Sequence, residues 1–203
     1  MTGNNGNTVS LAISGVGGQG VLTLADVLAK AALNDGLNVR VGEIHGMAQR
    51  GGHVVCTVRI GERVRGPIVD AGTADVLVGF EPVEVLREIA LVRRQGLVLM
   101  SSHVQYPVAV SMGKAEYPSH EEIQKAIRRF TDRVVEFDAF KLAEDAGSTR
   151  ALNMVMFGAI IGSDETPITK QAAFEAIRAS FPERYEKINI KAAENGMAQM
   201  KDR

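Results

Sequence analysis

Six residues near the start of the chain, GVGGQG at positions 15–20, constrain the fold more than any other segment. They follow an alternating apolar run that predicts a strand over 9–14. They also open an apolar-periodic run that predicts a helix over 20–34. A glycine-rich turn between a strand and a helix is typical of α/β folds that bind a ligand at this point.

The glycines let the backbone approach a ligand where any Cβ would obstruct it. The amides of such a turn, with the positive end of the helix dipole, suit an anion such as phosphate or carboxylate. A purely structural turn is the alternative, because glycine-rich turns also serve tight packing of a helix on a strand. The candidate binding residues in this turn are Gly15, Gly17, Gly18, Gln19 and Gly20.

Alternating strand and helix patterns continue through most of the chain, which predicts a three-layer α/β/α sandwich with a Rossmann-like first βα turn. Gly61-Glu62 predicts a two-residue hairpin between strands at 53–60 and 63–69. That hairpin makes the expected sheet mixed, although mostly parallel. Thr166-Pro167 predicts the start of a later helix, with threonine as N-cap and proline at the first helical position.

Composition narrows the function classes. The 203 residues predict a flexible tail over 1–8 and a single domain over 9–203 that ends in helices. A net charge of −1 leaves no electrostatic footprint for nucleic acid, and no apolar run approaches the length of about 20 residues that a membrane span needs. The lone Cys56 fits a reducing compartment, and the polar tail is unlike a signal peptide, so we expect a cytoplasmic protein.

Two kinds of chemistry are excluded by missing residues. The chain has no CxxC pair, so it cannot hold an iron–sulfur cluster alone. Gly15 and Gly20 have the spacing of a P-loop, but Val21 and Leu22 follow in place of lysine and serine or threonine. ATP hydrolysis by a P-loop mechanism is therefore excluded.

A second glycine-rich loop lies within residues 43–53 and supplies the candidate binding residues Gln49, Arg50, Gly51 and Gly52. It leaves a second predicted strand, 38–44, which we expect beside the first, so both loops should face one cleft at the carboxyl edge of the sheet. The Arg50 guanidinium could then close on a phosphate or carboxylate held by the first loop. In the alternative interpretation Arg50 is a solvated surface arginine.

Other polar residues have simpler interpretations. His45 and His53 lack a third ligand at suitable spacing, so we expect no metal site. Glu43 stands 23 residues after Gly20, where a dinucleotide fold places the acid that binds ribose, so NAD binding stays an alternative. Cys56 lies within an alternating strand and is interpreted as a core residue. Asn153 interrupts an apolar helix at 150–161. The polar groups of its buried side chain need hydrogen-bond partners, and we expect the first glycine-rich loop to supply one.

Four segments, 15–20, 43–52, 74–82 and 153–159, resemble the gamma-type subunits of 2-oxoacid:ferredoxin oxidoreductases, within a similarity that covers nearly the whole chain. The segment HGMAQRGG at 45–52 is similar to the beta subunit of indolepyruvate:ferredoxin oxidoreductase. Pyruvate-type relatives carry a Tyr-Gly-x-Glu-x-Arg-Gly version of this loop. The difference favours an aryl-pyruvate as substrate.

The resemblance implies a complex that decarboxylates a 2-oxoacid, passes the acyl group to coenzyme A and sends two electrons to ferredoxin. Thiamine diphosphate and iron–sulfur clusters would lie on partner chains, and this chain would complete the cleft and help bind coenzyme A. It supplies no catalytic residue in this interpretation, and the isolated chain, which could also self-associate, should be inactive. The alternatives are a free-standing NAD(P)-binding protein and a non-catalytic nucleotide sensor.

Overall fold

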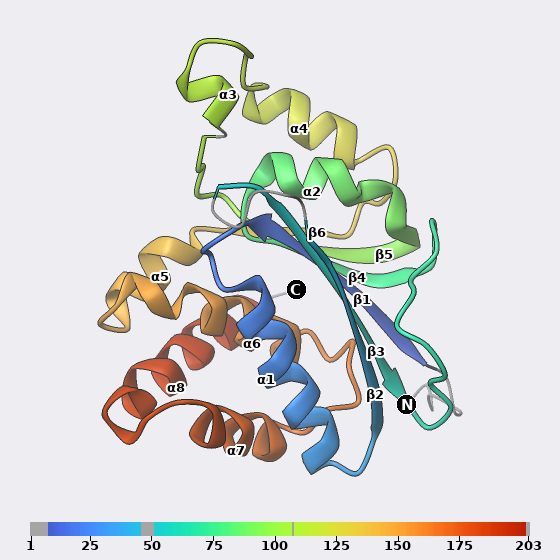
Figure 1. The fold of residues 1–203 in the computed structure, drawn as a ribbon, viewed down its shortest axis with the longest axis vertical. Helices are drawn as coiled ribbons and strands as arrows, with labels where there is room; N and C mark the ends of the chain where they lie inside the picture. Colours follow the sequence, from blue (N-terminus) through green and yellow to red (C-terminus); the bar gives the residue numbers. More distant parts are fainter. Residues whose placement is uncertain (1–7, 46–50, 107, 202–203) are drawn as a thin grey trace.

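A mixed sheet of six strands forms the centre of the molecule, in the order β2-β3-β1-β4-β5-β6 (Figure 1). The computed structural model describes residues 8–45, 51–106 and 108–201. Within these residues β3 alone runs against the other strands, since it pairs antiparallel with both β1 and β2 while β1, β4, β5 and β6 pair in parallel. The strands are β1 (Val9–Val16), β2 (Asn38–His45), β3 (His53–Gly61), β4 (Ala74–Gly79), β5 (Val92–Ser101) and β6 (Val134–Phe137).

Helices cover both faces of the sheet, which confirms the predicted three-layer α/β/α sandwich (Figure 1). One layer contains α1 (Val21–Asn34), α5 (Ala139–Asp145), α6 (Leu152–Gly162), α7 (Lys170–Ser180) and α8 (Glu183–Ala198). The other contains α2 (Pro82–Glu88) and α4 (His120–Ile127), with the short α3 (Val108–Ser111) beyond them. Two 3₁₀ turns, η1 (Ile89–Leu91) and η2 (Thr149–Ala151), join these elements.

The central strands are buried on both faces, and their side chains alternate between two cores. Val76 and Val78 of β4 face the larger core under α1 and α6, whereas Leu77 faces the smaller core under α2 and α4. This two-sided burial explains why the strands are nearly continuous apolar runs. In the described residues, no helix has the length and apolar character needed to cross a bilayer.

Helix α6 is buried at every position from Leu152 to Ile161, as its apolar run predicts. It packs against α8 through two glycines that bring the backbones together. A Cβ built on Gly158 would lie 1.9 Å from the Ala193 carbonyl oxygen, and one on Gly196 would lie 1.9 Å from the Val155 carbonyl oxygen. These two glycines are therefore required by close helix packing.

Two sequence predictions about local structure are wrong. Residues 64–70 form no strand, so the predicted hairpin at Gly61-Glu62 is absent, and β3 pairs with β2 and β1 instead. Helix α7 begins at Lys170 with Thr169 as its N-cap, three residues after the predicted threonine. Thr169 donates two hydrogen bonds to the Asp35 carboxylate. The Thr169 amide donates to Oδ2 at 2.6 Å, and the Thr169 hydroxyl donates to Oδ1 at 2.8 Å. That long-range contact is invisible in the local pattern.

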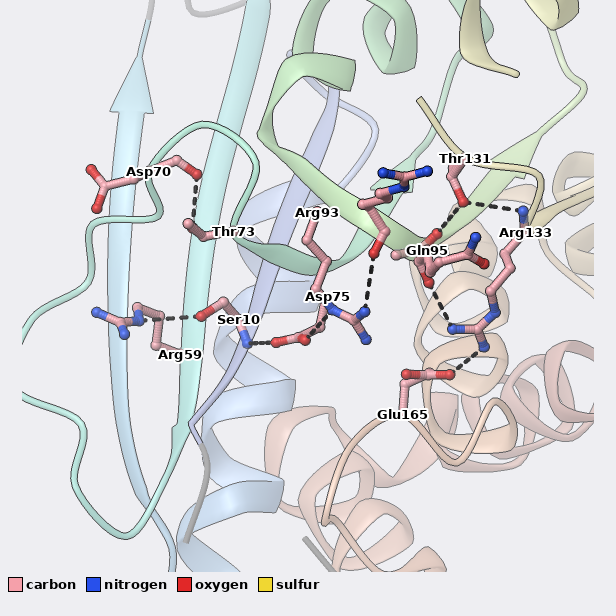
Figure 2. Close-up of polar contacts among 12 residues, drawn as sticks. Ser10, Arg59, Asp70, Thr73, Asp75, Arg93, Gln95, Thr131, Arg133 and Glu165 are labelled. Carbon is pink, nitrogen blue, oxygen red and sulfur yellow. Dashed lines mark hydrogen bonds and ion pairs between the residues drawn. The ribbon is translucent and has the colours of Figure 1, made fainter. Parts of the chain in front are cut away.

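The amino edge of the sheet is held by paired polar groups, which Figure 2 shows. Asp75 at the start of β4 accepts from the Ser10 amide at 2.8 Å and from Arg93 Nε at 2.6 Å. Arg133, just before β6, donates to the Gln95 carbonyl oxygen and pairs with Glu165. Because these charged groups pair with one another, we attribute a structural role to this edge. Open α/β sheets bind their ligands at the opposite, carboxyl edge.

Candidate functional site

The turn between β1 and α1 has a backbone that favours glycine. Gly18 and Gly20 have φ angles of 106° and 91°, in the left-handed region. Gly15 has a different role, because a Cβ there would lie 2.8 Å from Cγ2 of Val21. Gln19 folds back on the turn: its Oε1 accepts from the Val16 amide at 2.8 Å. Gly15 and Gln19 thus shape the turn, whereas the space around a Cβ at Gly18 is open.

The two glycine-rich loops adjoin each other. The Gly17 amide donates to the Gly52 carbonyl oxygen at 2.8 Å, and the Gly51 amide donates to the Gly17 carbonyl oxygen at 3.3 Å. They adjoin for a reason that differs from the expected one, since β3 lies between β1 and β2. β3 begins where β1 ends, with His53 opposite Val16, and so brings Gly51 and Gly52 to the turn. Gln49 and Arg50 lie outside the described residues.

A pocket of about 540 Å³ opens beside the first turn, a size within the usual range for small-molecule sites. It is lined by segments from four parts of the chain: the turn and the start of α1, the residues after β5, the helices α5 and α6 with η2, and the residue after α7. Gly51 and Gly52 do not line it. The lining residues are Gly18, Gln19, Gly20, Thr23, His103, Gln105, Phe140, Thr149, Arg150, Leu152, Asn153 and Phe181.

The electrostatics of this pocket favour an anion. Helix α1 begins at Val21 without a side-chain cap, and Gly20 and Thr23 at this end line the pocket, so the positive end of the helix dipole lies beside it. Arg150 is exposed, and within the described part of the chain its guanidinium makes no hydrogen bond or ion pair. The described lining residues include no carboxylate. Arg150 is thus a cation available to a bound anion.

Asn153 marks the floor of the pocket. It is 6% exposed, and its Oδ1 has no hydrogen-bond partner among the described residues. The predicted link to the first glycine-rich loop exists as a packing contact, because a Cβ on Gly20 would come within 2.9 Å of Asn153 Nδ2. It does not satisfy the amide oxygen. An unpaired buried oxygen is costly unless a ligand or water donates to it, which indicates a binding role for Asn153.

An aromatic wall stands on another side of the pocket. The rings of His103 and Phe140 stack with centroids 4.3 Å apart and an interplanar angle of 9°. Leu152 and Phe181 extend the apolar surface. A flat aromatic and apolar wall beside a glycine-rich turn at a helix N-terminus suits a ligand that joins a ring to a phosphate.

Two residues singled out in the sequence have roles away from the pocket. Cys56 is fully buried, and burial raises the pKa of its thiol to about 12, with a further contribution from the nearby charge of Glu43. The interpretation of Cys56 as a core residue is confirmed. Glu43 lies on the edge strand β2, with β3 between it and β1, whereas a dinucleotide fold places the ribose-binding acid on the strand next to the first. This arrangement disfavours NAD binding through Glu43.

Comparison with known proteins agrees with the fold and the sequence motifs. The model of the pyruvate ferredoxin/flavodoxin oxidoreductase family matches residues 10–199. The chain belongs to this family. It is 44% identical over 194 residues to the indolepyruvate oxidoreductase subunit IorB of Pyrococcus horikoshii, and the match covers 95% of this chain and 96% of that one.

Two solved structures of oxoacid oxidoreductases share the fold. The gamma subunit of a keto/oxoacid ferredoxin oxidoreductase from Geobacter sulfurreducens is 22% identical, with a TM-score of 0.71 over 95% of this chain and 98% of that one. A 2-oxoglutarate:ferredoxin oxidoreductase from Magnetococcus marinus, solved with 2-oxoglutarate, coenzyme A and succinyl-CoA bound, is 19% identical with a TM-score of 0.73. That match covers 96% of this chain but 31% of the other, so the fold recurs there as part of a longer chain.

The structure adds pocket residues that sequence reasoning missed. Arg150 and His103 were not identified from the sequence, because neither belongs to a recognised motif: His103 follows β5 in an irregular segment, and Arg150 lies in the short 3₁₀ turn η2. Asn153 did give one, as the polar exception in an apolar helix. Of the nine candidate binding residues, Gly18, Gln19 and Gly20 line the pocket.

Proposed function

We propose that this chain is the small subunit of a 2-oxoacid:ferredoxin oxidoreductase and that its pocket binds coenzyme A. The observation that carries the proposal is the conjunction of uncapped α1 amides, the Arg150 guanidinium and the unpaired Asn153 oxygen around one pocket. A diphosphate suits the amides and the guanidinium, since both bind phosphate oxygens through several hydrogen bonds. Gly18 and Gly20 leave the backbone open to it.

The remaining groups of coenzyme A also have matching surfaces. The stacked His103 and Phe140 rings offer an aromatic face to an adenine, and Asn153 Oδ1 can accept from an N–H or O–H of the ligand. Gly51 and Gly52, with Gln49 and Arg50 beside them in sequence, would adjoin the bound molecule from the neighbouring loop. Their direct contact with it is part of the proposal.

The substrate and partners follow from the relatives. Similarity to an indolepyruvate oxidoreductase subunit supports indolepyruvate or another aryl-pyruvate as the oxoacid. Occurrence of the fold within a longer oxidoreductase chain supports a larger partner subunit that carries thiamine diphosphate and, with it, iron–sulfur clusters and contact with ferredoxin. We place this complex in the cytoplasm, in keeping with a single buried cysteine.

In this assembly the chain would position a reactant and contribute no reacting group. Coenzyme A, when bound, supplies the thiol that accepts the acyl group. The chain's own residues would bind the diphosphate, orient the ligand and exclude water from the cleft, which are the contributions a protein makes to cofactor chemistry.

Ligand titration and copurification test the proposal. The purified chain should bind coenzyme A in calorimetry and should show no iron–sulfur absorbance and no oxidoreductase activity alone. Copurification from the native host should recover a larger thiamine-dependent subunit. Micromolar binding of NADH or NADPH in place of coenzyme A would contradict the proposal and favour a free-standing NAD(P)-binding protein. Tight ligand binding with no partner recovered would favour a nucleotide sensor.

A further inference from the structure

His53, the first residue of β3, lies between two carboxylates of helix α2. Its Nδ1 contacts Glu84 Oε2, and its Nε2 lies 2.8 Å from Glu88 Oε1. Glu84 and Glu88 stand four residues apart, so both point from one face of the helix. The Glu84 side chain is only 4% exposed, and the imidazole is 33% exposed. The ring therefore bridges β3 to α2 in a partly buried position.

This bridge depends on the protonation of the ring. An ionised carboxylate only accepts hydrogen bonds, so both contacts are hydrogen bonds only when both ring nitrogens carry a proton. A neutral ring would turn one lone pair toward a carboxylate oxygen and lose that contact. Among the described residues, the other charged group at the bridge is Arg87, whose Nε lies 3.4 Å from Glu84 Oε1. Behind it, the buried Glu81 accepts a hydrogen bond from Tyr117.

The bridge is connected to the glycine-rich turn through three consecutive residues. His53 follows Gly52, whose carbonyl oxygen accepts from the Gly17 amide, and Gly51 donates to the Gly17 carbonyl oxygen. His53 is also paired with Val16, the last residue of β1. A displacement of His53 from α2 would therefore move the two backbone hydrogen bonds that hold Gly17. Gly18 and Gly20, which line the pocket, follow directly.

We propose that His53 is a positioning residue, which fixes the glycine-rich turn through its bridge to Glu84 and Glu88. The inference rests on the proposed function in one respect, because coenzyme A serves as the reporter of the turn's position. Its structural part, the coupling of the ring to the two backbone hydrogen bonds that join Gly17 to Gly51 and Gly52, stands independently of the ligand.

Three variants of the full chain test it. His53→Arg keeps two donors for the two carboxylates and a permanent charge, so it should retain affinity for coenzyme A. His53→Gln carries no positive charge, and its two N–H groups share one nitrogen, so it cannot reproduce two charge-assisted contacts. It should weaken binding by about 5-fold or more, within the range of ordinary coupling between sites. His120→Gln is the matched control, since His120 also contacts a carboxylate, Glu136, but lies on α4 away from the turn.

Rescue by arginine separates positioning from simple stability. The affinity of His53→Arg for coenzyme A should stay near that of the native chain, while that of His53→Gln falls. His120→Gln should bind coenzyme A as the native chain does. A native-like affinity in His53→Gln, or an equal loss of affinity in His53→Arg and His53→Gln, would overturn the proposal. Should His53→Gln not fold, Glu88→Gln, which removes one charge and keeps an acceptor oxygen, replaces it.

A ligand-free measurement distinguishes this inference from the proposed function. Hydrogen exchange should show lower protection of the Gly17 amide in His53→Gln than in the native chain and in His53→Arg. If this holds while coenzyme A fails to bind, the proposed function fails and the positioning role stands. Unchanged protection of Gly17 in His53→Gln would overturn the positioning role itself.

Discussion

Gly20 packs directly against Asn153, so closely that a Cβ on the glycine would come within 2.9 Å of the asparagine Nδ2. The contact joins the first glycine-rich turn to helix α6, two parts of the chain that are far apart in sequence. It also sets the floor of the pocket, because both residues line it. The shape of the pocket therefore depends on the absence of a side chain at Gly20.

Replacing Gly20 by alanine should destabilise the fold and distort the pocket. The left-handed φ of 91° costs about 1–2 kcal/mol for an L-residue, and the contact with Asn153 adds to it. We expect a loss of about 2–3 kcal/mol in the free energy of unfolding, measured with urea. Gly36→Ala is the matched control, since Gly36 has a φ of 72° and open space around its Cβ position. An equal loss in the two variants would contradict the role of the Asn153 contact.

Arg150→Met should weaken coenzyme A binding without destabilising the chain. A charge-assisted hydrogen bond contributes about 1.5–3 kcal/mol, which calorimetry of the full chain would detect. The free energy of unfolding should change by no more than about 0.5 kcal/mol, as for other exposed positions. Arg129→Met, an exposed arginine beyond α4, should leave affinity unchanged. Unaltered affinity in Arg150→Met would exclude this guanidinium from the site.

Arg50→Ala tests the sequence-based expectation for the second loop. In the assembled complex it should weaken use of coenzyme A or the oxoacid by about 1.5–3 kcal/mol, because the guanidinium is expected to close on an anion. Thermal stability of the complex should be nearly unchanged. Steady-state turnover measures the effect. If turnover survives intact, Arg50 has no part in binding.

Thr169→Ala should cost stability, because it removes the N-cap of α7. The Thr169 Oγ1 accepts from the Ala172 amide at 3.2 Å and donates to Asp35. Loss of such a cap costs about 1 kcal/mol, measured by denaturant unfolding. Thr166→Ala is the informative comparison, since the sequence pattern places the cap there. A larger loss of unfolding free energy in Thr166→Ala than in Thr169→Ala would indicate that Thr166 is the N-cap, as the sequence pattern predicts.

Glu81 should make stability fall as the pH rises. Burial raises the pKa of its carboxyl above 4.5, and this effect exceeds the opposing hydrogen bonds from Tyr117 and from backbone amides. A raised pKa in the folded state means that the stabilising contribution is complete below pH 4.5 and is lost as pH rises through the folded value. The stability of Glu81→Gln relative to the native chain should therefore increase with pH from about 4.5 upward.

Glu122→Gln provides the control of opposite sign for Glu81. Hydrogen bonds from Ser119 lower the pKa of the Glu122 carboxyl, so its contribution is present above pH 4.5 and is lost as the pH falls. Urea unfolding of both variants between pH 3.5 and pH 8 measures the two trends. A pH-independent difference between Glu81→Gln and the native chain would show that burial does not shift this group.

The sequence alone determined the layers, the first βα turn and the buried helix α6. These follow from local causes: apolar periodicity and glycine at a tight turn. The interpretation of Cys56 as a core residue was also available from alternation along its strand. Family membership followed from the motifs that these local features carry.

The tertiary structure decided what depends on contacts between distant segments. Strand order was not predictable, because β3 enters between β1 and β2 through pairing that no local pattern encodes. The start of α7 depends on Asp35, and the pocket brings Gly20, Arg150 and Asn153 together from separate elements. Periodicity reports which face of an element is buried but not which neighbour buries it, and a binding site is made of such neighbours.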